Sequence, residues 1–205
     1  MKTNTELVNY LINKKILKSS NIINSFNQID RRNFVKESDF YYAYLDRPLS
    51  IGYGQTISQP STVAFMLELL SPNSGEFILD IGSGSGWTTA MLAYIVGEKG
   101  YVKGLERISE LVIFGENNLK KYQIKNAKII LSGNNLGIKG KQFDKILVSA
   151  SAEEIPIELI EQLKKGGTMV IPIINSIFTI KKGDDEKIYM AEYPNFVFVP
   201  LIYQK

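Results

Sequence analysis

Three glycines follow an acidic residue in a spacing that suits a nucleotide-binding turn. Gly82, Gly84 and Gly86 alternate with serines directly after Asp80 and Ile81. Glycine lets the backbone turn tightly and come close to a ligand. The dinucleotide fingerprint is GxGxxG, and the last interval here is one residue shorter. Because glycine triplets also occur in ordinary tight turns, the loop indicates a nucleotide without identifying it.

Two carboxylates narrow the choice of ligand. Glu106 ends the next predicted strand, where a carboxylate can accept hydrogen bonds from both hydroxyls of a ribose; the alternative is a plain charge at a strand end. Asp80 lies before the glycines, where its charge would repel a pyrophosphate but attract a cation such as an amino group. A ligand with ribose, adenine and a cationic amino-acid tail is S-adenosylmethionine. The pattern therefore favours this cofactor over NAD.

Two further polar segments have the composition of a binding site. Asn134 follows a later predicted strand, where its amide could pair with an adenine edge; an Asx turn is an equal alternative. Residues 48–60 contain glycines, hydroxyls and two glutamines just before a predicted helix. Such a donor-rich loop can hold an anion, and the residues by themselves fit a generic connector equally well.

Strands alternate with helices through the middle of the chain, which predicts a parallel sheet covered on both faces. Strands are predicted over residues 77–81, 101–105, 127–131, 145–149 and 168–174, the last after a turn at Gly166-Gly167. Helices are predicted over residues 87–96, 109–122 and 156–163.

The two ends of the chain break this alternation. Helical spacing of apolar residues predicts helices over residues 5–17, 22–29 and 60–70, and residues 30–51 are expected to form loop and short turns. At the other end, three short strand-like pieces, 177–180, 188–191 and 196–199, predict an antiparallel edge hairpin.

Composition excludes several kinds of chemistry. The 205 residues include no cysteine and no histidine, so thiolate metal sites, cysteine nucleophiles and the usual general base are absent. The formal net charge is +3, and the basic residues occur as scattered pairs rather than a stripe. We therefore expect no nucleic-acid partner.

The polar N-terminus lacks a signal-peptide core, and no apolar run approaches the roughly 20 residues that span a bilayer. We expect a soluble, cytoplasmic protein without membrane association. The sequence leaves the oligomeric state open.

Residues 54–60, Gly-Gln-Thr-Ile-Ser-Gln-Pro, followed by Asp-Ile-Gly-Ser-Gly-Ser-Gly at 80–86, resemble the protein-L-isoaspartate (D-aspartate) O-methyltransferase family. The first run is specific to that family, whereas many methyltransferases share the glycine loop. The similarity continues in collinear order through residues 105–111, 143–148, 155–156, 162–167, 170–172 and 198–201.

The resemblance implies a fold as well as an activity. It implies a Rossmann-like, class I S-adenosylmethionine-dependent methyltransferase sheet, of the α/β class, with an N-terminal helical cap and antiparallel C-terminal edge strands. We expect a single domain over 1–205, with cap and acceptor loop in 1–60, cofactor-binding core in 61–175 and edge strands in 176–205.

The implied reaction transfers a methyl group from S-adenosylmethionine to the α-carboxylate of L-isoaspartyl residues in damaged proteins, which leads to repair through a succinimide. The partners would be isoaspartyl-containing proteins and peptides. Ser58 would lie beside the acceptor carboxylate and the methyl group as the catalytic residue. Thr56 and Ile57 would line the acceptor pocket, and Val197 and Pro200 would hold the substrate backbone.

The residues expected to bind the cofactor are Asp80, Gly82, Gly84, Gly86, Glu106 and Asn134. Family members usually carry Gly-Asp-Gly where this chain has Gly133-Asn134-Asn135, which changes the charge at the adenine contact.

A carboxylate acceptor agrees with the missing histidine. Its pKa is about 4, so it is already a nucleophile at neutral pH, and attack on a methyl group needs alignment and desolvation rather than a base. Two alternatives stay open: a non-catalytic S-adenosylmethionine-binding module that recruits isoaspartyl peptides, and a methyltransferase for another peptide carboxylate.

Overall fold

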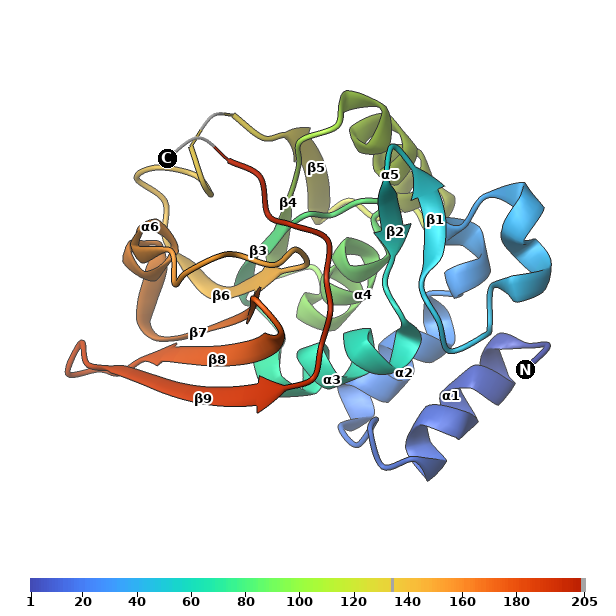
Figure 1. Ribbon diagram of the computed structural model, residues 1–205, viewed down its shortest axis with the longest axis horizontal. Helices are drawn as coiled ribbons and strands as arrows, with labels where there is room; N and C mark the ends of the chain where they lie inside the picture. Colours follow the sequence, from blue (N-terminus) through green and yellow to red (C-terminus); the bar gives the residue numbers. More distant parts are fainter. Residues whose placement is uncertain (134, 204–205) are drawn as a thin grey trace.

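A seven-stranded mixed sheet forms the centre of the computed structural model, which describes residues 1–133 and 135–203 (Figure 1). The strand order is β5-β4-β3-β6-β7-β8-β9. The strands are β3 (Phe77–Ile81), β4 (Tyr101–Glu106), β5 (Ala127–Leu131), β6 (Phe143–Val148), β7 (Leu163–Ile173), β8 (Ser176–Lys182) and β9 (Ile188–Pro194). The first five run parallel, whereas β8 and β9 form an antiparallel edge. The predicted α/β sheet with an antiparallel C-terminal edge is confirmed.

Helices cover both faces of this sheet. On one face, α4 (Trp87–Val96) and α5 (Ser109–Lys121) pack on β3, β4 and β5, and α3 (Pro60–Leu70) packs on β6, β7 and β8. The short helix α6 (Ile157–Glu161) packs on β7 from the other face. Alternate residues of a strand point to opposite sides of the sheet. Val170 accordingly joins the core under the first set of helices, and Met169 joins the core under α6.

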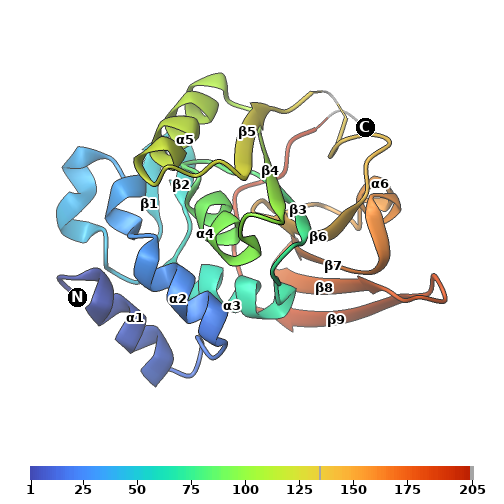
Figure 2. The ribbon, with the colours of Figure 1, turned by 180° about the vertical axis from the view of Figure 1, so that it is seen from behind.

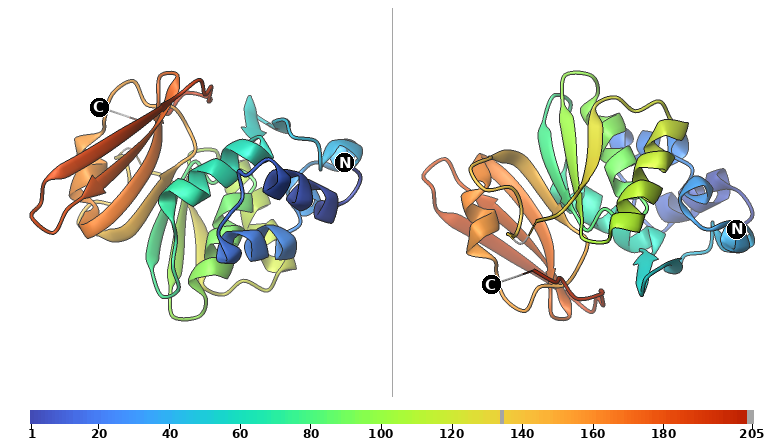
Figure 3. Two further views of the ribbon diagram at one scale, coloured as in Figure 1. Left: turned by 90° about the horizontal axis from the view of Figure 1, so that it is seen from below. Right: turned by 90° about the horizontal axis from the view of Figure 1, so that it is seen from above.

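An outer helical layer precedes the sheet in the sequence. Helix α2 (Ser20–Gln28) packs on α4 and α3, and α1 (Asn4–Asn13) packs on α2 (Figure 2). Figure 3 shows this layer, in blue, on the side of the molecule away from the β8-β9 hairpin. Two 3-10 turns, η1 (Arg31–Phe34) and η2 (Glu37–Tyr42), follow in the region expected to form loop and short turns. Within the described residues no helix is long and apolar enough to cross a membrane.

Residues 49–57, expected to be a loop, form an antiparallel hairpin of β1 (Leu49–Gly52) and β2 (Gln55–Ile57). The turn residues Tyr53 and Gly54 both have positive φ, 54° and 70°. This is the type I′ geometry that suits the twist of two-residue hairpins. A pattern typical of a hairpin was present in the sequence, because Gly54 follows the alternating apolar residues Leu49 and Ile51.

Two other expectations about the C-terminal half were wrong. Strand β7 begins at Leu163 and runs through the predicted Gly166-Gly167 turn, with a register shift between its pairs with Phe143 and Lys145 of β6. The glycines therefore mark an irregularity within a strand rather than a turn before it. Residues 196–199 form no strand; single hydrogen bonds join Phe196 to the carbonyl of Asn175 and the carbonyl of Val199 to Ser151, and Pro200 beside them forms an isolated bridge with Ser151.

One glycine of β4 lets the loop after β3 lie directly on the sheet. A Cβ at Gly104 would lie 2.6 Å from the Ser83 hydroxyl and 2.8 Å from Cγ1 of Ile129. The space that it leaves is used by Ser83, whose hydroxyl donates to the carbonyl of Asp80 at 3.0 Å. The backbone N–H groups of Gly82 and Ser83 donate to the carbonyl of Leu105 at 2.8 and 3.1 Å.

We expect Gly104→Ala to lower the free energy of unfolding by about 1–3 kcal/mol, because the added methyl group must displace the Ser83 hydroxyl and Ile129. Urea unfolding followed by circular dichroism measures this. The control is Lys128→Ala, an exposed position on the neighbouring strand β5, with an expected change within about 0.5 kcal/mol. Equal stability of the Gly104 variant and wild type would contradict the close packing of this loop.

Candidate active site

A pocket opens at the carboxyl ends of the parallel strands, where β3 lies between β4 and β6. The chain leaves β3 toward β4 on one side and later returns to β6 on the other, and ligands of doubly wound sheets bind at such a switch point. Its walls are the β1-β2 hairpin, the loop after β3, the end of β4, residues near 132–137, the end of β6 and the C-terminal segment 199–203.

The glycine loop forms one wall. Gly82, Gly84 and Gly86 have φ values of +79°, +50° and +84°, in a region that side chains disfavour. Gly82 and Gly84 line the pocket. Gly86 instead lies against α5, because a Cβ there would be 3.2 Å from the carbonyl oxygen of Gly115. The first two glycines therefore open the wall toward a ligand, and the third permits close packing of the helix behind it.

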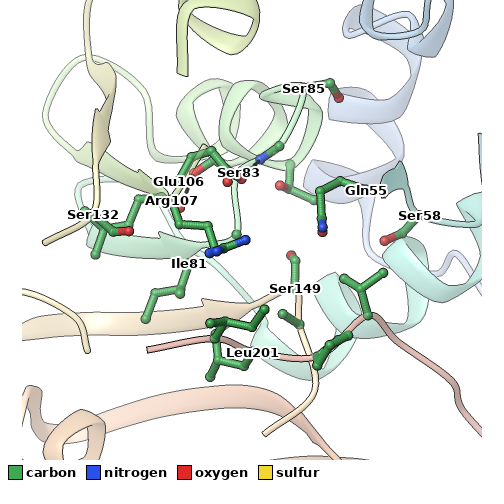
Figure 4. Close-up of a pocket in the computed structure, with 18 of the residues that line it drawn as sticks. Gln55, Ser58, Ile81, Ser83, Ser85, Glu106, Arg107, Ser132, Ser149 and Leu201 are labelled. Carbon is green, nitrogen blue, oxygen red and sulfur yellow. Dashed lines mark hydrogen bonds between the residues drawn. The ribbon is translucent and has the colours of Figure 1, made fainter. Parts of the chain in front are cut away.

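Glu106 is held beside this loop at the end of β4 (Figure 4). One carboxylate oxygen accepts a hydrogen bond from the N–H of Gly84 at 3.0 Å, and the other accepts one from the N–H of Ile108 at 3.0 Å. The residue is 5% exposed and lines the pocket. Each carboxylate oxygen can accept more than one bond, so both retain capacity for the hydroxyls of a ligand.

Asp80 lies behind the pocket rather than at its mouth. It is fully buried, and Oδ2 accepts hydrogen bonds from the hydroxyls of Thr88 at 2.9 Å and Thr89 at 2.6 Å in the first turn of α4. Oδ1 has no hydrogen-bond partner among the described residues. Burial raises the pKa of Asp80 to about 6, with the two hydroxyls opposing that shift. Thr88, unlike Asp80, lines the pocket.

The β1-β2 hairpin supplies the opposite wall. Thr56, Ile57 and Ser58 all line the pocket, and Figure 4 shows the Ser58 hydroxyl directed toward the cavity. The hairpin also touches the glycine loop, since a Cβ at Gly84 would lie 3.1 Å from Cδ1 of Ile51. The β1-β2 hairpin and the glycine loop thus form two walls of one cavity.

The C-terminal segment crosses the mouth of the pocket. It is tied to the end of β6 by hydrogen bonds from the N–H of Ser151 to the carbonyl of Val199 and from the N–H of Leu201 to the carbonyl of Ser151, both 2.8 Å. Pro200 lines the pocket, whereas Val197 is 88% exposed and does not. Asn134 lies outside the described residues; its neighbours Gly133 and Asn135 line the pocket.

Several residues that line the pocket were not predicted from the sequence. Arg107 directs its guanidinium into the cavity, and Ser149 directs its hydroxyl there from the residue after β6 (Figure 4). The rule that carboxyl ends of parallel strands meet at one edge predicts such positions once the strand order is known. The sequence contains the strands, but it does not show which two flank β3.

The described residues suit S-adenosylmethionine in their chemistry. Two acidic side chains border the glycine loop, one with free acceptor capacity toward the pocket and one with an unpartnered buried oxygen. Carboxylates attract a ribose and a cationic amino-acid tail, and they repel phosphates. No cluster of three metal-ligating side chains occurs within residues 1–133 and 135–203.

Comparisons with known proteins agree with this geometry. The sequence model of the protein-L-isoaspartate(D-aspartate) O-methyltransferase family (PCMT) matches residues 2–205. Protein-L-isoaspartate O-methyltransferase of Methanosarcina mazei is 38% identical over 200 residues, which cover 96% of this chain and 80% of the relative. The enzyme of that name from Methanopyrus kandleri is 40% identical over 204 residues, 96% of this chain and 89% of the relative.

A solved structure matches nearly the whole fold. It is that of a Plasmodium falciparum protein assigned as a protein-L-isoaspartate O-methyltransferase, in complex with S-adenosyl-L-homocysteine. The TM-score is 0.86 at 30% identity, over 98% of this chain and 99% of that one. From its strand order, its pocket and these relatives, the chain belongs to the protein-L-isoaspartate (D-aspartate) O-methyltransferase family.

Proposed function

We propose that this chain methylates the α-carboxylate of L-isoaspartyl residues in damaged proteins, with S-adenosylmethionine as the methyl donor. Family membership supports the reaction and the cofactor. The observation that carries the assignment is that the family-specific segment with Thr56, Ile57 and Ser58 shares one pocket with Glu106 and the glycine loop. The substrates would be proteins and peptides that contain isoaspartate.

Each carboxylate has a distinct part on the cofactor side. Bound S-adenosylmethionine supplies an electrophilic methyl group on a sulfonium. Glu106 accepts hydrogen bonds from the ribose hydroxyls with the lone pairs that Gly84 and Ile108 leave free. The ionised Asp80, behind the loop, provides a negative potential for the amino group of the cofactor; the expected adenine contact of Asn134 lies outside the described residues.

The acceptor side needs no general base. The acceptor carboxylate is ionised at neutral pH, and the sequence contains no histidine to serve as a base. The Ser58 hydroxyl donates a hydrogen bond to one oxygen of that carboxylate. This contact directs the other carboxylate oxygen toward the methyl group. Thr56 and Ile57 exclude water from the cavity, which strengthens this alignment. Pro200 and Val197 hold the backbone of the peptide.

We expect the protein to transfer labelled methyl from S-adenosylmethionine to an isoaspartyl peptide and to leave its aspartyl twin unlabelled. The ester should be released by mild base, as expected for a carboxyl methyl ester. Labelling of both peptides, or of neither, would contradict the proposed function. Binding of the isoaspartyl peptide without turnover would instead identify a recruitment module.

We expect Ser58→Ala to lower kcat about ten- to hundredfold, because the acceptor loses a positioned donor. The dissociation constant for S-adenosyl-L-homocysteine should stay within about twofold of wild type, since Ser58 lies on the acceptor wall. Fluorescence of Trp87, the one tryptophan of the sequence and part of the pocket wall, measures that binding. The control is Ser50→Ala, an exposed position paired opposite Thr56 in the same hairpin. Loss of activity and of cofactor binding together would assign Ser58 a structural role.

We expect the affinity for S-adenosyl-L-homocysteine to fall as the pH drops through about 6, where Asp80 takes up a proton and loses its attraction for the amino group. The same Trp87 titration, repeated from pH 8 to pH 5, measures this. The free energy of unfolding of the ligand-free protein should change in the opposite direction. Because the pKa is raised from 3.8 to about 6 on folding, the contribution of Asp80 to stability is full below 3.8 and is lost as the pH rises through 6. In Asp80→Asn both trends should flatten; unchanged trends would show that another group titrates.

A further inference from the structure

We propose that Arg31 and Asp46 are positioning residues that hold the Ser58 segment in its working geometry from behind the pocket. The proposal rests on the proposed function of Ser58. Neither Arg31 nor Asp46 lines the pocket, and Arg31 comes from the 3-10 turn that follows the outer helical layer. The segment between the outer helical layer and the β1-β2 hairpin would therefore support the acceptor site.

The guanidinium of Arg31 donates hydrogen bonds to carbonyl groups of two segments, residues 43–47 and Ser58. Nη1 donates to the carbonyls of Ala43 at 2.7 Å and Leu45 at 3.3 Å, and Nη2 donates to those of Arg47 at 2.9 Å and Ser58 at 3.1 Å. The residue is fully buried. A guanidinium presents its donors in a rigid planar fork, which a lysine cannot reproduce. The carbonyl of Ser58 is thus fixed relative to the chain before the hairpin.

The guanidinium of Arg31 keeps its positive charge at neutral pH although it is buried. Burial lowers the pKa of Arg31 to about 9, and the negative charge of Asp46 opposes that shift, so the group is protonated at neutral pH. The Cζ atom of Arg31 lies 5.5 Å from the ring centroid of Trp87, which belongs to the first turn of α4 and lines the pocket. A cation over an indole face is a favourable contact. Arg31 therefore contacts both the segment that carries Ser58 and the helix α4, which follows the glycine loop.

Asp46 fixes the other end of the Ser58 segment. Its carboxylate accepts a hydrogen bond from the N–H of Ser61 at 2.9 Å, in the first turn of α3. The N–H groups of a first helical turn have no partner within the helix, and they favour a negative charge. The residue at the N-cap, Gln59, makes no side-chain cap. Asp46 therefore supplies the cap from a distance.

Four residues, 58–61, are thus held by a cation at the first carbonyl and an anion at the last N–H. The other side of the same backbone presents the Ser58 hydroxyl to the pocket. A displacement of about 1 Å at a reacting group can lower a rate about a hundredfold. Loosening either end should therefore affect the acceptor step and spare the cofactor contacts of Glu106, which lie across the pocket.

The test compares Arg31→Lys and Asp46→Ala with two matched controls, Arg32→Lys and Asp39→Ala. Arg32 is exposed, with its guanidinium over Phe40, and the carboxylate of Asp39 accepts a hydrogen bond from the hydroxyl of its neighbour Ser38 at 3.3 Å. For both test variants we expect kcat with an isoaspartyl peptide to fall at least about tenfold. The dissociation constant for S-adenosyl-L-homocysteine, measured by isothermal titration calorimetry because Arg31 itself contacts Trp87, should stay within about threefold of wild type. The controls should match wild type in both.

A second measurement separates this proposal from the proposed function. Hydrogen–deuterium exchange of a peptide spanning residues 58–63 should be faster in Asp46→Ala than in wild type, whether or not the protein methylates isoaspartate. Absence of methylation by wild type would overturn the proposed function, whereas unchanged exchange and unchanged kcat in Asp46→Ala would overturn the positioning role. A parallel loss of kcat and of cofactor affinity would also overturn it, because it would indicate a general structural defect. If Arg31→Lys does not fold, Asp46→Ala decides the question.

Discussion

The parallel pairing of β3 with β4 on one side and β6 on the other is the constraint on which the site depends. It brings the carboxyl ends of three strands to one edge. The glycine loop after β3, Glu106 at the end of β4 and Ser149 after β6 all line one pocket. Because ladder hydrogen bonds hold the strands about 4.8 Å apart, the loops after them can reach one small ligand. The chemistry of the pocket is a consequence of this register.

Two buried acids meet the cost of desolvation in different ways. Backbone N–H groups satisfy both oxygens of Glu106, which leaves its charge available at the pocket surface. Two threonine hydroxyls satisfy one oxygen of Asp80, and the other has no partner among the described residues. A carboxylate held in this way is sensitive to the charge of what binds nearby. The glycine loop thus has negative potential on it from two acids, which would attract a cationic ligand, and the sequence contains no histidine.

Polar groups outside the pocket hydrogen-bond to the backbone that follows the β1-β2 hairpin. The hairpin that carries Thr56 and Ser58 is short, with only three paired positions. An isolated two-stranded hairpin is marginally stable in water. Contacts behind it, from the buried Arg31 and from Asp46, give the segment partners that the hairpin itself lacks. Residues before the hairpin are therefore linked to the pocket wall, although neither Arg31 nor Asp46 lines the cavity.

The sequence by itself determined the local elements: β3, α4 and α3 were predicted at their observed bounds, because apolar periodicity, glycine and proline act over a few residues. It also predicted site roles for Glu106 and for the segment around Ser58, and the structure places both at the pocket. Only the tertiary structure decided that Asp80 lies behind the wall, that Gly86 packs on α5, and that Arg31 reaches the Ser58 carbonyl. These depend on contacts between residues far apart in the chain, and no local pattern records which buried group a distant segment will meet.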